Sequence, residues 1–211
     1  MAPATEPRVR ASHLKEDLEA FRVLGAAGEA GARARLRPET TRAIEEAARV
    51  EFLPVAVKAE LAEAVFAEAG EPGARRWARE ALLLSLQGLY RPLVAAILAV
   101  ADPTPTTILR LSFPRGWQAS YRDCGEFAVE EPAPGQTRLV LRGVPPALRI
   151  RSYLAALCGT LEAIWEVSSY TGEVELERWG PAVEEAAWLM GWRRKERPAA
   201  PGPGSPGRSS P

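Results

Sequence analysis

The sequence predicts an α+β fold in which an N-terminal helical half packs on a small antiparallel sheet, with a long amphipathic helix between two strand pairs. Three patterns predict it. Apolar residues recur at helical spacing through the first half, the segments 126–130 and 138–142 match as a charged hairpin, and the segment 173–179 alternates with period two. Helices followed by strands along a chain are typical of α+β domains.

The first half of the chain divides into helices at its glycines and prolines. After a short strand at 9–13, we expect helices at 15–24, 38–49, 55–70, 74–90, 93–100 and 106–113. The helix at 74–90 is apolar on several sides, which indicates a central position in the core. Gly25, Gly28 and Gly31 follow a helix and lack phosphate-loop spacing, so they indicate a flexible joint between helices.

In one register, the predicted hairpin of 126–130 and 138–142 has an apolar face and a charged face. Four cross-strand pairs result, two apolar and two of opposite charge: Phe127 with Leu141, Val129 with Leu139, Glu126 with Arg142, and Glu130 with Arg138. Opposite charges that face each other across strands add roughly 0.2–1 kcal/mol per pair. A slip by one residue would disrupt this division of faces, so the pattern selects the register.

A long amphipathic helix is predicted at 150–168, after Pro145-Pro146 has ended the hairpin. Its apolar stripe has the spacing of a single helix face, and we expect it to cover the apolar side of the sheet. A pocket between this helix and the sheet would hold an apolar small molecule. The candidate lining residues are Phe127, Leu154, Cys158, Leu161 and Trp165.

A second stripe of the same helix, Ala155, Gly159 and Ala163, has almost no side chain. Glycine inside a helix costs about 1 kcal/mol relative to alanine, so Gly159 indicates that another backbone packs closely there. Packing within the chain is the favoured interpretation. The alternative is a homodimer or another protein partner, with these three residues as the interface.

The C-terminal part of the chain predicts a strand pair. Gly172 is expected to turn the chain into a strand at 173–179 whose outer face carries three glutamates. The segment 186–193 fits a helix as well as a strand, and we predict a strand because Trp188, Met190 and Trp192 alternate. Residues 1–7 and the Pro/Gly/Ser-rich segment 196–211 are predicted to be disordered, which leaves one α+β domain at 8–195.

Composition excludes several classes of protein. The 211 residues include 27 basic and 27 acidic side chains, so general affinity for nucleic acid has no electrostatic basis. The longest apolar run, 93–101, is too short for a membrane span. Two cysteines, Cys124 and Cys158, make neither a disulfide framework nor a metal knuckle. A cytoplasmic protein is the expectation.

The sequence carries no catalytic signature, and we expect no enzyme, metal or cofactor. His13 is the only histidine, and we expect it at the surface or at a helix start, which disfavours Ser–His–Asp and Cys–His catalysis. No convergent His, Cys or carboxylate spacing predicts a metal site. Cys124 is a candidate reactive thiol because Arg122 is near in sequence, although an inert turn cysteine is favoured.

Several aromatic and glycine positions resemble the DUF2378 family of myxobacterial proteins. The matching positions are Gly88-x-Tyr90-Arg91, Pro103, the run Phe113-Pro114-x-x-Trp117-x-x-Ser120-Tyr121-x-Asp123-x-Gly125-Glu126, and Gly191-Trp192-Arg193. That family is similar in layout to haem-NO-binding, vinyl-reductase-like and TRAPP-subunit folds. The resemblance implies helices on one side of an antiparallel sheet and a pocket for a small molecule or acyl chain.

The chain departs from those folds at their functional positions. A haem-NO-binding domain needs a proximal histidine on a helix before the sheet and a Tyr-x-Ser-x-Arg clamp, whereas here His13 is far upstream and Tyr121-Arg122-Asp123-Cys124-Gly125 does not match. The final turn also lacks the cysteine of vinyl-reductase-like domains. We therefore expect a non-catalytic ligand-binding or sensory module without haem, and a dimeric scaffold protein as the alternative.

Overall fold

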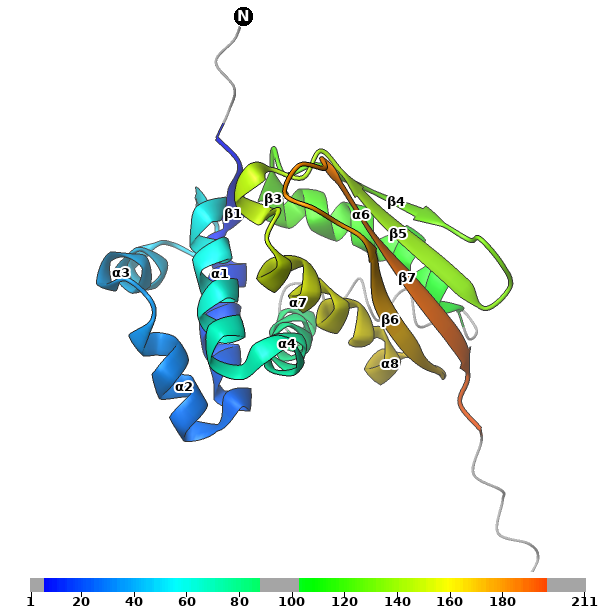
Figure 1. Ribbon diagram of the computed structural model, residues 1–211, viewed down its shortest axis with the longest axis horizontal. Coiled ribbons are helices and arrows are strands. Elements are labelled where there is room, and N and C mark those ends of the chain that lie inside the picture. The colour runs from blue at the N-terminus through cyan, green and yellow to red at the C-terminus, as the bar shows by residue number, and fades with distance from the viewer. Residues whose placement is uncertain (1–5, 88–102, 197–211) are drawn as a thin grey trace, which may run out of the picture.

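The computed structural model describes residues 6–87 and 103–196, and it has the α+β class that the sequence predicts (Figure 1). The helical elements are α1 (Ala11–Ala20), η1 (Phe21–Leu24), α2 (Gly25–Ala34), α3 (Pro38–Glu46), α4 (Val55–Gln87), α6 (Pro105–Ser120), η2 (Pro146–Leu148), α7 (Arg151–Glu162) and α8 (Ile164–Val167). The strands are β1 (Arg8–Arg10), β2 (Phe52–Pro54), β3 (Tyr121–Arg122), β4 (Glu126–Glu130), β5 (Gln136–Arg142), β6 (Tyr170–Arg178) and β7 (Glu185–Arg194). The helix expected at 93–100 and most of both terminal segments lie outside the described residues.

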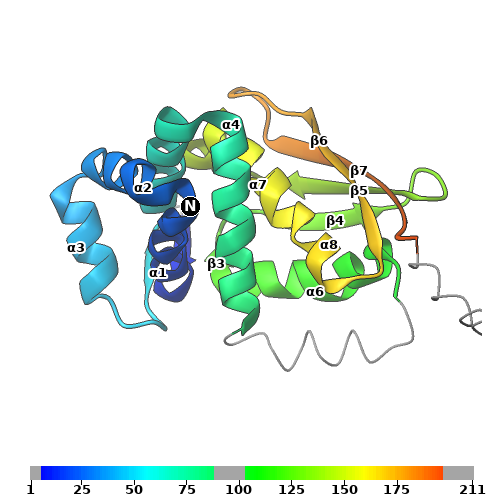
Figure 2. The same cartoon turned by 90° about the horizontal axis from the view of Figure 1, so that it is seen from below.

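The elements are arranged in layers from the N-terminal helices to the sheet. Figures 1 and 2 show α1, α2 and α3 at one end, the sheet of β4 to β7 at the other, and α4 and α7 between them. Helix α4 contacts both α1 and α7, and α7 contacts β6 on its other side. The core therefore continues from the N-terminal helices through α4 and α7 to the sheet.

The first half differs from the prediction at its short elements. The strand expected at 9–13 ends at Arg10, so His13 lies on α1. The segment 52–54, between two predicted helices, is β2, which pairs with β1 in a sheet of order β2-β1-β3. The glycines expected to form a flexible joint belong to α2. The expected break at Gly70 is confirmed: its φ of 63° kinks α4 just before Pro72.

The four-stranded sheet has the order β4-β5-β7-β6 with antiparallel pairs throughout. All four predicted cross-strand pairs of the first hairpin are confirmed, from Glu126 opposite Arg142 to Glu130 opposite Arg138. The ambiguous segment 186–193 is a strand, as predicted, and β7 lies between β5 and β6. Gly172, expected at a turn, lies inside β6 opposite Trp192.

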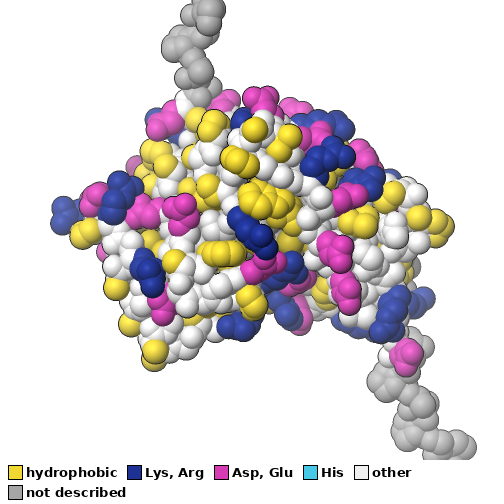
Figure 3. All heavy atoms as spheres, viewed as in Figure 1, with side chains coloured by type: hydrophobic (Ala, Val, Ile, Leu, Met, Phe, Trp, Pro, Cys, Tyr) yellow, Lys and Arg dark blue, Asp and Glu magenta, His cyan; other side chains and the backbone are white. Residues whose placement is uncertain are grey.

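The outer face of this sheet carries a network of ion pairs. Arg138 binds Glu177 at 2.7 Å, a closer contact than its 4.0 Å to the predicted partner Glu130. Arg142 pairs with Glu130 and Glu185, at 3.7 and 3.4 Å. Figure 3 shows acidic and basic side chains interspersed with apolar ones over one face of the molecule, as expected for a chain of zero net charge.

The inner face of the first hairpin is covered by α6 and not, as predicted, by the helix at 150–168, which contacts β6 instead. Helix α6 is also longer than the sequence indicates. The pattern predicts a helix at 106–113 that ends near Pro114, but α6 continues to Ser120. Phe127 of β4 lies edge-on to Phe113 and Trp117, with ring centroids 4.9 Å away in each case. Packing of Trp117 on the sheet and its stacking on Tyr121 stabilise the helical turn after the proline.

Helix α7 occupies the predicted place between the strand pairs but is not amphipathic. The expected continuous helix at 150–168 is divided into α7 and α8, and nine of the twelve α7 residues are buried. One side faces α4, and another faces the sheet, where the Trp188 indole N–H donates to the Leu154 carbonyl oxygen at 3.1 Å. Burial on two sides is typical of a helix at the centre of a core.

Candidate functional site

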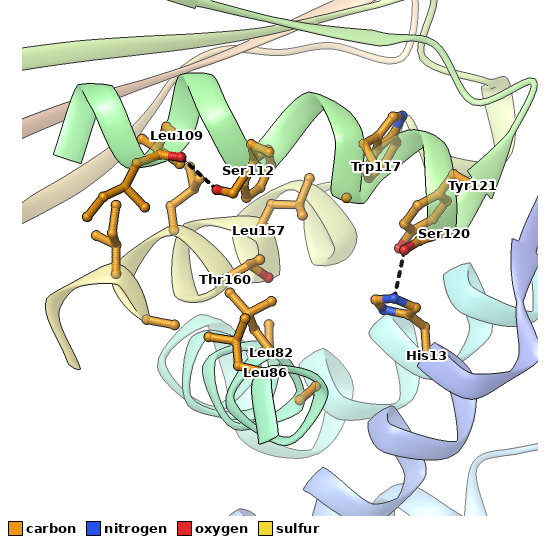
Figure 4. Close-up of a pocket in the computed structure, with 18 of the residues that line it drawn as sticks. His13, Leu82, Leu86, Leu109, Ser112, Trp117, Ser120, Tyr121, Leu157 and Thr160 are labelled. Atoms are coloured by element: carbon orange, nitrogen blue, oxygen red, sulfur yellow. Dashed lines mark hydrogen bonds between the residues drawn. The ribbon is translucent and has the colours of Figure 1, made fainter. Parts of the chain in front are cut away.

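A cavity of about 170 Å³ lies among α1, α4, α6, α7 and α8 (Figure 4). Most of its wall is apolar and comes from four helices: Leu82 and Leu86 of α4, Ile108, Leu109, Phe113 and Trp117 of α6, Leu157 and Leu161 of α7, and Ile164 and Val167 of α8. Small residues leave the space between the helices, namely Ala78, Ala81, Gly116 and Ala163. A cavity of this kind favours an apolar occupant.

One part of the wall is polar, because Asp17 of α1 and Lys58 of α4 form a buried ion pair there. The Lys58 Nζ lies 2.7 Å from both carboxylate oxygens of Asp17, and it also lies 4.8 Å from the centre of the Trp77 ring. Burial raises the pKa of Asp17, against the opposing effect of Lys58. The two charges compensate each other, so this part of the wall is polar without a net charge.

His13 of α1 and Ser120 of α6 also meet at the cavity, with His13 Nε2 2.8 Å from the Ser120 hydroxyl oxygen. Burial, together with the positive charges of Lys58, Arg10 and Arg49, lowers the pKa of His13 to about 3. A serine and a histidine at this distance resemble a nucleophile and its base. However, an imidazole with so low a pKa is a weak base at neutral pH, so the pair is poorly suited to general-base catalysis.

The expected pocket residues do not surround this cavity together. Leu161 lines it, but the other four, Phe127, Leu154, Cys158 and Trp165, are not part of its wall. Phe127 packs among the aromatic residues of α6 and β7, and Cys158 is buried near Arg75. The cavity lies on the helical side of α7 and not between α7 and the sheet, because large side chains such as Trp188 fill the sheet side.

The small-residue stripe expected as a dimer interface packs inside the chain. Ala155 and Ala163 are buried, and a Cβ on Gly159 would overlap the backbone of Arg75 in α4. Ala163 also lines the cavity. The close approach of another backbone at Gly159, inferred from the sequence, is therefore the contact between α7 and α4. In the folded chain this stripe is not accessible to a partner.

Cys124 lies in the turn before β4, where it is buried rather than exposed. Its thiol is 3.1 Å from the Arg122 carbonyl oxygen and 3.6 Å from that of Arg8. Burial raises the pKa of the thiol to about 11, so very little thiolate exists at neutral pH. The neighbouring Arg122 does not activate the thiol, because its guanidinium lies 3.8 Å over the Phe52 ring.

Sequence reasoning missed most of the wall, including Asp17, Lys58, Ser120 and Thr160. One signal was present: Asp17 falls on the same helical face as Leu14 and Leu18, which is unusual for a carboxylate that faces water. The rest carried no local signal, since the wall joins helices that are distant in sequence. Among the described residues, no group of three His, Cys, Asp or Glu side chains is arranged to hold a metal ion.

The fold is that of the H-NOX domains, the haem-NO-binding layout implied by the resemblance. No protein-family model and no curated protein matches the chain, so the DUF2378 resemblance stays a prediction. Fe(II) unliganded H-NOX from K. algicida is similar over 91% of this chain and 100% of its own, with 11% identity and a TM-score of 0.60. A variant of Tt H-NOX, and an oxygen-binding H-NOX domain related to soluble guanylate cyclases, are each similar over 89% of this chain and 95% of their own, with 10% identity and a TM-score of 0.56.

Haem, which this fold family implies, does not fit the described residues. The one histidine of the chain lies on α1, and its Nε2 is engaged with Ser120. Neither Cys124 nor Cys158 belongs to the cavity wall. The cavity volume of about 170 Å³ is close to that of a cavity that holds benzene, whereas pockets for larger ligands span roughly 300–1,000 Å³. The cavity therefore suits a much smaller molecule than a porphyrin.

Proposed function

We propose that this protein is a non-catalytic ligand-binding or sensory module that holds a small apolar molecule in the cavity among α4, α6 and α7. The observation that carries the proposal is the cavity itself. Protein interiors are closely packed, yet here small residues on three helices leave a partly open pocket with room for a ring-sized ligand. The H-NOX-like fold supports the proposal, since solved structures of this fold include an oxygen-binding domain.

The cavity has a direct connection to the rest of the fold. Its wall includes residues of α1 and α4 from the N-terminal half, and residues of α6 and α7, which contact the sheet. A ligand bound between these helices would stabilise one relative arrangement of them. A sensory output would then be a change in the position of the N-terminal helices relative to the sheet.

Binding of toluene tests the proposal, because toluene is apolar and of the right size. We expect the purified protein to bind it, as measured by titration calorimetry, and native mass spectrometry to detect co-purified small molecules. Gly116→Leu should lower toluene affinity at least about tenfold, because a Cβ at Gly116 meets no atom within 4 Å and the leucine fills the cavity. Gly191→Leu is the matched control, since Gly191 has similar open space on β7, outside the cavity.

The outcome that would refute the proposal is a wild-type protein that neither binds toluene nor is stabilised by it. Equal loss of affinity in the Gly116→Leu and Gly191→Leu variants would also refute it, because the effect would then not arise in the cavity.

The alternative is a dimeric scaffold protein, and its remaining surface is the charged outer face of the sheet. The small-residue stripe is buried against α4 and cannot contribute. Sedimentation across a wide range of protein concentration tests this alternative. A single monomeric species at all concentrations would exclude the homodimer.

A further inference from the structure

The small sheet of β2, β1 and β3 carries three arginines on its outer face. Val9 in the middle of β1 is fully buried, so its neighbours Arg8 and Arg10 face the other way, towards solvent. Arg122 of β3 lies directly opposite Arg8. Phe52 of β2 lies opposite Arg10. Three strands that are distant in sequence thus bring three guanidinium groups to one side of one sheet.

Two of these guanidinium groups converge on the Phe52 ring. The guanidinium carbon of Arg122 lies 3.8 Å from the ring centre, and that of Arg10 lies 5.3 Å from it. An aromatic ring attracts cations, but two cations on the same ring also repel each other. Like charges that face each other across strands, as in Arg8 and Arg122, are destabilising. A bound anion would relieve both repulsions.

The protein itself offers these arginines little negative charge. Arg8 contacts Glu6 at 3.4 Å, and both side chains are about half exposed. Within residues 6–87 and 103–196, the guanidinium groups of Arg10 and Arg122 contact neither a carboxylate nor another hydrogen-bond acceptor. The Nε of Arg10 is moreover buried without a partner. Each guanidinium has five N–H donors, so both remain available to an anion.

A phosphate group matches this charge better than a carboxylate does. Of the two acids beside the strands, Glu51 accepts a hydrogen bond from the Ala48 N–H, and Asp123 forms no ion pair with a described residue. The three arginines therefore face the single carboxylate of Glu6. A phosphate monoester carries a charge of roughly −1.5 to −2 at pH 7, close to the remaining surplus. The planar fork of arginine also binds phosphate oxygens in pairs.

We propose that the outer face of the β2-β1-β3 sheet is a binding site for a dianionic phosphate group. Arg10 and Arg122 hold the phosphate oxygens, and Arg8 adds to the positive charge around them. The phosphate belongs either to a soluble molecule or to the headgroup of a phospholipid. None of these arginines lines the cavity, so the site is independent of the apolar ligand proposed above.

Methyl phosphate is the soluble probe, and acetate is the carboxylate to compare with it. We expect methyl phosphate, at low ionic strength, to shift the backbone amide signals of β1 and β3 in NMR titrations of the full chain. Arg122→Gln should lower its affinity at least about tenfold, the effect of losing charged hydrogen bonds. Because Arg122 also packs on Phe52, the exposed Arg8→Gln is a second variant, with an expected loss of about two- to fivefold.

Arg193→Gln is the matched control. It removes the same charge from an exposed arginine near the C-terminal end of β7, which lies far from β1 (Figure 1). This variant should bind methyl phosphate as the wild type does. All four proteins should have the same circular dichroism spectrum, so that a loss of affinity is not a loss of fold.

Sedimentation with phosphatidylcholine vesicles that contain phosphatidic acid identifies the source of the phosphate. Binding to these vesicles that is lost in Arg122→Gln would assign the phosphate to a lipid headgroup. Binding of methyl phosphate without binding to the vesicles would assign it to a soluble molecule.

Three results would overturn the proposal. In the first, the wild-type protein binds neither methyl phosphate nor the vesicles. In the second, acetate binds as tightly as methyl phosphate, so the site does not select a dianion. In the third, Arg193→Gln weakens binding as much as Arg122→Gln does, so the attraction comes from the charge of the whole chain.

Discussion

Gly159 of α7 lies directly against Arg75 of α4, so close that a Cβ on the glycine would overlap the arginine carbonyl oxygen. The Arg75 side chain is also fixed, since it binds Glu71 at 3.0 Å, Glu162 at 2.8 Å and the Val174 carbonyl oxygen at 3.1 Å. Neither the backbone nor the side chain of Arg75 is free to move aside. This contact joins the N-terminal half to the helix that lies beneath the sheet.

Substitution of Gly159 should destabilise the protein before it changes any oligomeric state. We expect Gly159→Ala to lower the free energy of unfolding by about 1–3 kcal/mol, because the neighbouring atoms belong to a backbone and must shift. Gly116→Ala in α6 is the matched control. It meets no atom within 4 Å and should stabilise the helix by about 0.5–1 kcal/mol. Urea denaturation of both variants measures the difference, and equal effects would contradict the close contact.

The stability of the protein should fall as the pH is lowered from 6.5, because of His13. In the folded chain its pKa is lowered to about 3, whereas in the unfolded chain it protonates near 6.5. Between pH 6.5 and about 3 the unfolded state therefore binds more protons than the folded state. The stability that is present above pH 6.5 is lost as the pH falls through this window. The maximal slope from one such group is about 1.4 kcal/mol per pH unit.

His13→Gln should flatten this dependence, measured as the free energy of unfolding between pH 7.5 and 5. The chain has no other histidine, so no second imidazole titrates in the same range. An unchanged slope in the variant would show that His13 protonates normally in the folded protein.

Both thiols should be unreactive in the folded protein. Burial raises the pKa values of Cys124 and Cys158 to about 11 each. We expect neither to react with a disulfide reagent at pH 7.5 over the time in which both react in denaturant. Counting the modified thiols by mass spectrometry is the measurement, with Cys124→Ser to assign them. Rapid modification of Cys124 alone would restore it as a candidate reactive thiol.

Removal of one partner from the Asp17–Lys58 pair should lower the free energy of unfolding more than removal of both partners. The side chains are 3% and 11% exposed, so Lys58→Met leaves a buried carboxylate without its counter-charge. We expect this variant to lose about 3–5 kcal/mol of stability. The double variant Asp17→Leu, Lys58→Met should recover a large part of the loss, and thermal unfolding compares the three proteins. A double variant that is less stable than Lys58→Met would contradict the pairing of the two side chains.

The parts of the fold that the sequence predicted depend on interactions between near neighbours. The hairpin register follows from alternating residues on two strands joined by a short loop, so matched charges and apolar pairs were sufficient to define it. The end of a helix at Gly70 was predicted for a similar reason, since Gly70 and Pro72 act on the backbone locally; in the structure this break is a kink within α4. The length of α6 was not predicted, because the contacts of Trp117 with the sheet outweigh the effect of Pro114.

The sequence by itself determined the fold class, the pairing of the first hairpin, and the absence of a second histidine with which to build a metal or catalytic site. Only the tertiary structure decided which side of α7 has free space. Leu161 and Cys158 occupy the same predicted apolar stripe, yet one faces the cavity and the other is buried near Arg75. The physical reason is that a cavity is the space left among helices that are distant in the chain, and the volumes of all their side chains together fix where it lies.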